Sequence, residues 1–119
     1  MSAKAAVRQS GTVTIVDLSG RITLGEGSGM LRTTVKDLMA AGHNKILFNL
    51  ADVSYIDSAG LGEFVGAYAS VTNHGGDVKL LNVPSKVIDL LQITKLFTVF
   101  ATYTNEAEAV KSFGAAAGA

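Results

Sequence analysis

The chain has 119 residues, of which 48% are hydrophobic and 17% are charged, and its ten basic residues balance ten acidic ones. This length and composition are typical of one globular domain with its own core, and they exclude a disordered chain. The balanced and scattered charge argues against a nucleic acid partner and against a polybasic membrane anchor.

The first half of the chain alternates strand and helix patterns. β-branched residues dominate a predicted strand at 12–18, and a weaker strand is predicted at 6–9. A flexible glycine-rich loop is predicted at 25–29, followed by a helix over 31–39 whose apolar residues recur every three or four positions. The apolar run at 45–50 predicts a strand in the interior of a parallel sheet.

The second half continues the same alternation. It predicts a helix over 58–73, a strand at 78–83, a short helix from Pro84 to Leu91, an edge strand at 98–103 and a last helix capped by Asn105. Strands that alternate with helices imply an α/β fold. We expect a mixed, mostly parallel sheet of about four to five strands with about four helices.

We expect a single domain over residues 1–114. Residues 115–119 contain only alanine and glycine and are predicted to form a disordered tail. Residues 1–8 lack the apolar core of a signal peptide, and no apolar run approaches the ~20 residues that a membrane span needs, so a cytoplasmic protein is predicted. The absence of cysteine excludes disulfides, thiol catalysis and iron–sulfur clusters.

Two candidate sites fail on their spacing. The stretch Gly25-Glu26-Gly27-Ser28-Gly29 contains G-x-G, but Met30 stands where a dinucleotide-binding loop needs a third glycine, and Glu26 breaks the G-x-S-x-G pattern of a hydrolase. His43 and His74 are the two histidines, and neither belongs to an H-E-x-x-H motif. We therefore expect no bound cofactor and no metal site.

The most informative stretch is Asp57-Ser58-Ala59-Gly60-Leu61-Gly62, which follows the buried strand and starts the helix over 58–73. The first turn of a helix carries free backbone N–H groups and a partial positive charge, which suit an anion or a phosphate. Ser58 is therefore either an ordinary N-cap, a role for which Asp57 is equally suited, or a switch.

Gly60 and Gly62 argue against a purely structural interpretation of this helix start. Each costs about 0.5–1 kcal/mol relative to alanine in a helix. They therefore indicate that another protein or a phosphate approaches the backbone closely here. Leu61 is either an exposed apolar anchor or the first core residue of the helix, and the pattern leaves both interpretations open.

The motif at 57–62 resembles the Asp-Ser-Ser/Ala/Thr-Gly-Leu/Met-Gly motif of the bacterial anti-sigma factor antagonists, the small single-domain members of the STAS family. The preceding strand, the Gly75-Gly76 break and the helix from Pro84 to Leu91 fit the same family, so the resemblance covers nearly the whole chain. One feature departs from it: family members often carry Glu-Leu-Asp after the early glycine, whereas Arg21-Ile22-Thr23 stand here. Thr23 thus replaces the family acid.

The resemblance implies a partner-switching regulator rather than an enzyme. In this family, the unphosphorylated antagonist binds an anti-sigma factor that is also a serine kinase, and that binding frees the sigma factor. The kinase then phosphorylates the motif serine, here Ser58, and a PP2C-type phosphatase resets the switch. We expect a protein that is monomeric when free and needs no cofactor.

The partner surface is predicted to combine the Ser58 turn with the neighbouring helix that starts at Pro84. The predicted partner-binding residues are Asp57, Ala59, Gly60, Leu61, Gly62, Ser85, Val87 and Ile88. A phosphate on Ser58 adds a charge of about −1.5 to −2, which repels acidic groups of a docked partner and must be desolvated at the interface.

Two alternatives remain open at this point. The first is a STAS module that does not switch, either as a subunit of a stress-signalling complex or as an accessory subunit of a transporter. The second is a small serine hydrolase, which Ser58 alone does not exclude.

Overall fold

The computed structural model describes the backbone of residues 3–118 and the side chains of residues 3–113. It contains a five-stranded sheet in which the strands follow one another in chain order. The strands are β1 (Lys4–Ser10), β2 (Val13–Ile22), β3 (Lys45–Ile56), β4 (Asp77–Leu81) and β5 (Thr102–Tyr103). β1 pairs antiparallel with β2, and the other three pairs are parallel. The expected mixed, mostly parallel α/β fold is confirmed.

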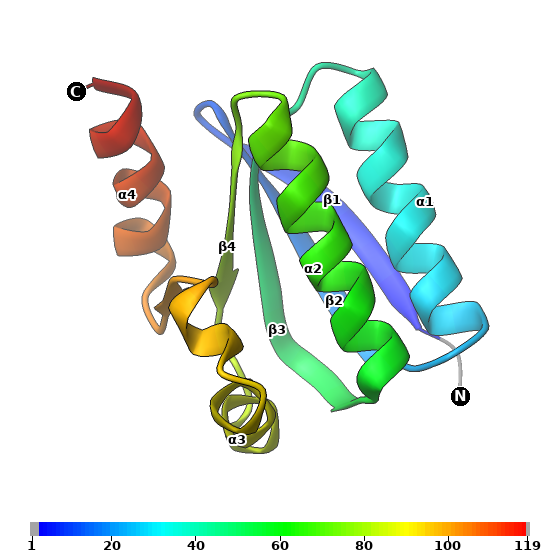
Figure 1. The fold of residues 1–119 in the computed structure, drawn as a ribbon. Coiled ribbons are helices and arrows are strands. Elements are labelled where there is room, and N and C mark those ends of the chain that lie inside the picture. The colour runs from blue at the N-terminus through cyan, green and yellow to red at the C-terminus, as the bar shows by residue number, and fades with distance from the viewer. Residues whose placement is uncertain (1–2, 119) are drawn as a thin grey trace.

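Helices cover both faces of the sheet. They are α1 (Glu26–Ala40), α2 (Ser58–Asn73), α3 (Ser85–Ile93) and α4 (Glu106–Gly118), with a 3-10 turn at Leu96–Thr98. α1 and α2 run side by side across one face, α4 stands beside β4 at the other side of the molecule, and α3 lies at the lower end of the sheet (Figure 1).

The core has two parts, one on each face of the sheet. The larger part, beneath α1 and α2, contains residues such as Val16, Phe48 and Phe64, with the rings of Phe48 and Phe64 packed edge to face at 5.2 Å. The smaller part, beneath α4, contains Ile15 and Phe113. Because both faces are covered, the first half of β3 is mostly apolar, as expected for an interior strand of a parallel sheet.

The prediction of a flexible loop at 25–29 is wrong, because α1 begins at Glu26. One glycine here has a packing role: a Cβ atom on Gly27 would lie 2.5 Å from the carbonyl oxygen of Arg21 at the end of β2. The hydroxyl of Ser28 also accepts a hydrogen bond from the Gly25 N–H at 3.2 Å. The glycine-rich stretch thus lets the start of α1 pack tightly against the sheet.

Every observed strand differs in length from the predicted one, and the differences are largest at β3 and β5. β3 continues to Ile56 instead of ending near residue 50, since its pairing with β2 resumes beyond an irregularity in register. The predicted edge strand at 98–103 shrinks to Thr102–Tyr103, because Leu96–Thr98 form a 3-10 turn in which Leu96 packs against the core.

The domain limits 1–114 and the disordered tail at 115–119 stay predictions. The backbone of α4 is helical through Gly118, and Ala119 lies outside the described residues.

Candidate functional site

The turn between β3 and α2 is held by the carboxylate of Asp57. Asp57 is the N-cap of α2, and its Oδ1 accepts a hydrogen bond from the Gly60 N–H at 2.8 Å. Its Oδ2 accepts a second one, at 3.0 Å, from the N–H of Leu24 in the link between β2 and α1. These backbone donors, Gly60 first and Leu24 second, lower the pKa of Asp57. One carboxylate therefore accepts a hydrogen bond from a free N–H group in the first turn of α2, and it also connects this turn to the link between β2 and α1.

The structure decides the question of which residue caps α2. Ser58 is the first residue of the helix and is exposed, whereas Asp57 takes the capping position. The hydroxyl of Ser58 is therefore not needed for the cap and stands on the surface at the positive end of α2.

The two glycines of the motif differ in their surroundings. A Cβ atom on Gly60 would lie 2.0 Å from the carbonyl oxygen of Ile22, so the helix packs directly on the end of β2 at this position. The inference that Gly60 marks the approach of another molecule is therefore wrong, because the molecule's own backbone fills that space. Gly62 is exposed and a Cβ atom there would meet nothing within 4 Å, so Gly62 has no such internal reason.

The predicted partner-binding residues differ in accessibility. Leu61 is 6% exposed and Val87 is 5% exposed, and both belong to the core. The interpretation of Leu61 as an exposed anchor is therefore wrong, and it is the first core residue of α2. Gly62 and Ser85 are exposed, whereas Asp57, Ala59 and Ile88 are half-buried. Gly60 is buried.

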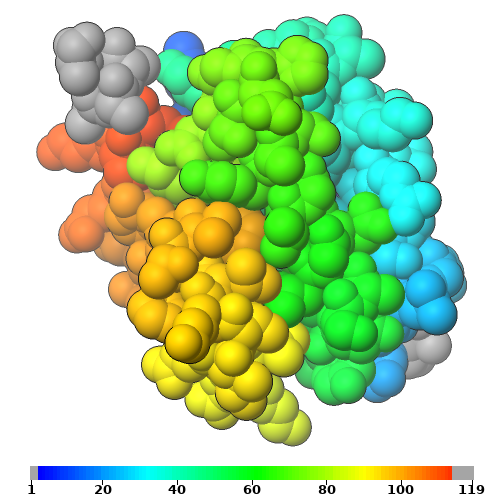
Figure 2. Space-filling model, viewed as in Figure 1, coloured from blue at the N-terminus to red at the C-terminus, as the bar shows by residue number. Residues whose placement is uncertain are grey.

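The starts of α2 and α3 lie at the same edge of the sheet, because both helices follow the carboxyl ends of neighbouring parallel strands. In the space-filling view, the surfaces of α2 (green) and of α3 with the turn after it (yellow to orange) lie side by side on one face (Figure 2). The expected juxtaposition of the two predicted segments is therefore present.

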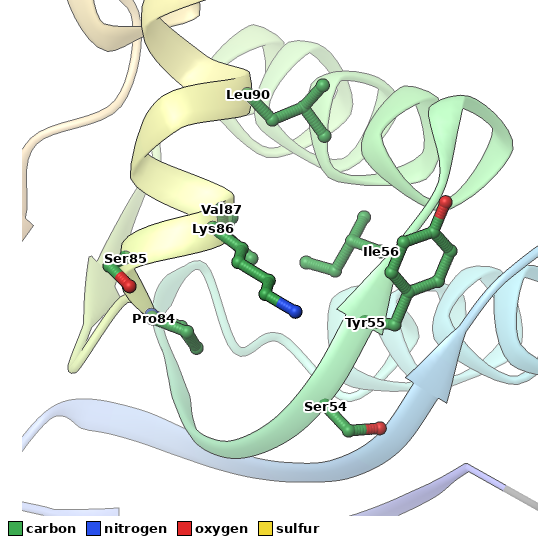
Figure 3. A pocket seen from close by; sticks show the side chains of 8 residues that line it. All are labelled: Ser54, Tyr55, Ile56, Pro84, Ser85, Lys86, Val87 and Leu90. Atoms are coloured by element: carbon green, nitrogen blue, oxygen red, sulfur yellow. The ribbon is translucent and has the colours of Figure 1, made fainter.

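A pocket of about 370 Å³ lies between the end of β3 and the start of α3. It is lined by Ser54, Tyr55, Ile56, Pro84, Ser85, Lys86, Val87 and Leu90 (Figure 3). The pocket wall at Ile56 directly precedes Asp57 in the chain, so the pocket adjoins the Ser58 turn.

Sequence reasoning did not single out Tyr55, Arg21 or Lys86. The guanidinium carbon of Arg21 lies 5.0 Å from the centre of the Tyr55 ring, a distance at which a cation is attracted to the ring face. Both residues are exposed, at the ends of β2 and β3. The Arg-Ile-Thr departure from the family pattern was the available signal for Arg21. Tyr55 could not be found, since the sequence did not show that β3 extends this far.

The link that carries Thr23 also borders the Ser58 turn. The Thr23 carbonyl oxygen accepts a hydrogen bond from the Ser28 N–H at 2.9 Å, and the next residue, Leu24, binds Asp57. The side chain of Leu24 is 79% exposed. The link that binds Asp57 therefore carries an uncharged Thr23 and an apolar Leu24.

The helices described for residues 3–118 include none that is long and apolar enough to cross a membrane.

Comparison with known proteins agrees with this architecture. The family description "STAS domain" matches residues 4–109. The anti-sigma-B factor antagonist of Bacillus subtilis is 35% identical over 81% of this chain and 86% of its own length. The anti-sigma F factor antagonist of Paenibacillus polymyxa is 30% identical over 82% of this chain and 84% of its own length. The crystal structure of a candidate anti-sigma factor antagonist from Thermotoga maritima superposes with a TM-score of 0.85 at 27% identity, and covers 92% of this chain and 93% of that one. The chain therefore belongs to the STAS-domain family, as its Asp-Ser-Ala-Gly-Leu-Gly motif indicated.

Proposed function

We propose that this protein is an anti-sigma factor antagonist that is switched by phosphorylation of Ser58. Its relatives in Bacillus subtilis and Paenibacillus polymyxa are named as antagonists of anti-sigma factors, and they match more than four fifths of the chain. The proposal rests on the structure at the start of α2. Asp57 caps the helix, so Ser58 beside it is exposed and is not needed for the cap.

The unphosphorylated protein binds an anti-sigma factor that is a serine kinase, and the bound sigma factor is released. Contact with the partner is made by the exposed part of the Ser58 turn, including Gly62, and by the start of α3 around Ser85. The buried residues Gly60, Leu61 and Val87 act by shaping these surfaces rather than by touching the partner.

Phosphorylation changes the charge of this surface without refolding the domain. The phosphate adds about −1.5 to −2 charges at neutral pH next to the carboxylate of Asp57. Because that carboxylate already occupies the Gly60 and Leu24 N–H groups, the new charge is only partly offset by the helix start. A loss of about 3 kcal/mol at the interface is enough to lower affinity more than a hundredfold.

The remaining parts of the proposal follow from this role. The protein is a substrate of its kinase and has no catalytic activity of its own. A PP2C-type phosphatase removes the phosphate. The protein acts in the cytoplasm as a monomer when it is free.

The first experiment identifies the phosphorylated residue. The chain is incubated with ATP and an anti-sigma factor serine kinase from the same genome, and phosphopeptides are identified by mass spectrometry. We expect stoichiometric modification of Ser58, which Ser58→Ala abolishes. Ser85→Ala is the matched control, because Ser85 is also an exposed serine at the first position of a helix. Modification that persists in Ser58→Ala would contradict the proposal.

The second experiment tests the effect of charge on binding. We expect Ser58→Ala to bind the kinase persistently and Ser58→Asp to lose most of its affinity, as measured by calorimetry. Asparagine has nearly the same shape as aspartate but no charge, so Ser58→Asn should bind like the wild type. Equal affinities of the Asp and Asn variants would show that charge is not the switch. Tight binding to a kinase that never modifies Ser58 would instead support the non-switching module.

A further inference from the structure

The pocket beside the Ser58 turn has apolar walls. Ile56 and Val87 are buried and form its floor, and Pro84 and Leu90 are half-buried at its sides. The ring of Tyr55, which is 45% exposed, stands at the rim (Figure 3). A site of this volume and composition accommodates an apolar side chain.

One positive charge faces the interior of this pocket. Among the described lining residues Lys86 is the single charged one, and its amino group points into the space between α3 and the end of β3 (Figure 3). A second cation, Arg21, lies against the Tyr55 ring at the rim. Across residues 3–113, neither Lys86 nor Arg21 forms a salt bridge. Asp89, the acidic residue of α3, does not line the pocket.

We propose that this pocket receives an apolar side chain that is accompanied by a carboxylate, supplied by the protein partner. The apolar walls hold the side chain, and Lys86 and Arg21 attract the carboxylate. The inference rests on the proposed function and names the chemistry by which the partner recognises the start of α3.

A protein partner fits this surface because the apolar area extends past the pocket. Leu24, which is 79% exposed, lies in the link between β2 and α1 and donates its N–H to Asp57, and Tyr55 lies at the end of β3, two residues before Asp57. Exposed apolar side chains gathered around a polar turn are typical of protein interfaces. The pocket is therefore one part of a larger contact surface.

The placement also explains why phosphorylation releases the partner. Ser58 is two residues beyond the pocket residue Ile56, so the backbone distance between them is at most about 7 Å. This is within one Debye length, ~8 Å, at physiological ionic strength. A phosphate on Ser58 repels the carboxylate of the partner and competes with it for Lys86 and Arg21.

Small probes test the pocket without any partner. Phenylacetate, phenylacetamide and phenethylamine share a benzyl group and differ in charge, and each is titrated into ¹⁵N-labelled protein while the amide shifts of Tyr55, Lys86 and Val87 are followed. We expect phenylacetate to bind about two- to fivefold more tightly than the amide, and the amide more tightly than the amine. Lys86→Met should reduce this preference, because only Arg21 then remains to attract the carboxylate, and Lys86→Glu should reverse it. Lys111→Met on α4 is the control and should change nothing. Equal affinities for the three probes, or shifts outside the pocket, would overturn the proposal.

The partner complex tests the occupant. In the binding assay with the anti-sigma factor kinase, Lys86→Glu should lower affinity about tenfold, whereas Lys111→Glu should not change it. If Lys86→Glu binds like the wild type, the assigned occupant is wrong and the proposed function stands. If the wild type binds no such kinase, the proposed function and the occupant fail together, and the probe titration still decides whether the pocket prefers anions.

Discussion

The starts of α2 and α3 are alike in position and opposite in charge. Each helix follows a parallel strand at the same edge of the sheet, and each has a serine, Ser58 or Ser85, as its first residue. The start of α2 holds the carboxylate of Asp57. The start of α3 has Pro84 as its N-cap, no capping hydrogen bond from a side chain, and Lys86 as its second residue.

A serine at the start of a helix therefore does not by itself define an anion site. At α2 the favourable position for a negative charge is already occupied, so a phosphate on Ser58 increases a negative charge that is present. At α3 the corresponding region is positively charged and adjoins an apolar pocket. A partner that places an acidic group at α3 therefore responds strongly to a phosphate at α2.

The largest expected effect separates the two glycines of α2. Gly60→Ala should lower the free energy of unfolding by about 2–3 kcal/mol, because the added methyl group would meet the Ile22 carbonyl oxygen. Gly62→Ala should raise it by about 0.5–1 kcal/mol, because the methyl group enters open space in a helix. Urea unfolding followed by circular dichroism measures both. A stable Gly60→Ala would show that the start of α2 does not depend on tight contact with β2.

An intermediate effect tests which residue caps α2. Asp57→Ala should lower the midpoint of thermal unfolding by a few degrees, because two backbone N–H groups lose their acceptor. Ser58→Ala and Ser85→Ala should leave the midpoint nearly unchanged, since neither hydroxyl caps its helix. Calorimetric scans of the three variants give this comparison. If the midpoint fell as far in Ser58→Ala as in Asp57→Ala, Ser58 would also stabilise the start of the helix.

The smallest expected effect concerns acid stability. Backbone hydrogen bonds lower the pKa of Asp57 below its ordinary value of 3.8. A carboxyl group whose pKa is lower in the folded state adds stability above its unfolded pKa, and this contribution is lost as pH falls through the folded pKa. Below about pH 4, wild-type protein should therefore lose stability more steeply than Asp57→Asn. Arg8 also lowers the pKa values of Asp17 and Glu106. These two carboxyl groups contribute equally to the pH dependence of both proteins, so they do not affect the comparison. Urea unfolding at several pH values between 2 and 5 measures the stability of both proteins. If stability falls equally steeply with pH in wild type and in Asp57→Asn, the Asp57 carboxylate does not hold these hydrogen bonds.

The α/β alternation and the position of the motif could be predicted from local patterns in the chain. Apolar periodicity is a local property, and it predicted the strand at 45–50, the helix over 58–73 and the short helix after Pro84. The motif Asp57-Ser58-Ala59-Gly60-Leu61-Gly62, together with the buried strand before it and the elements after it, predicted the family. These features depend on neighbouring residues in the chain, which is why they could be read without a structure.

The roles of individual residues in the site became clear from contacts between distant parts of the chain. Gly60 meets Ile22, Asp57 binds Leu24 and Arg21 lies against Tyr55, and each of these contacts joins segments that are more than 30 residues apart in sequence. The pocket likewise exists because β3 extends to Ile56 and α3 returns to lie beside it. Contacts of this kind depend on sheet register and helix packing, which no local pattern encodes. For that reason Gly60, which the sequence indicated as a contact point for another molecule, is an internal packing position, and the positive charge near the Ser58 turn comes from residues outside the motif.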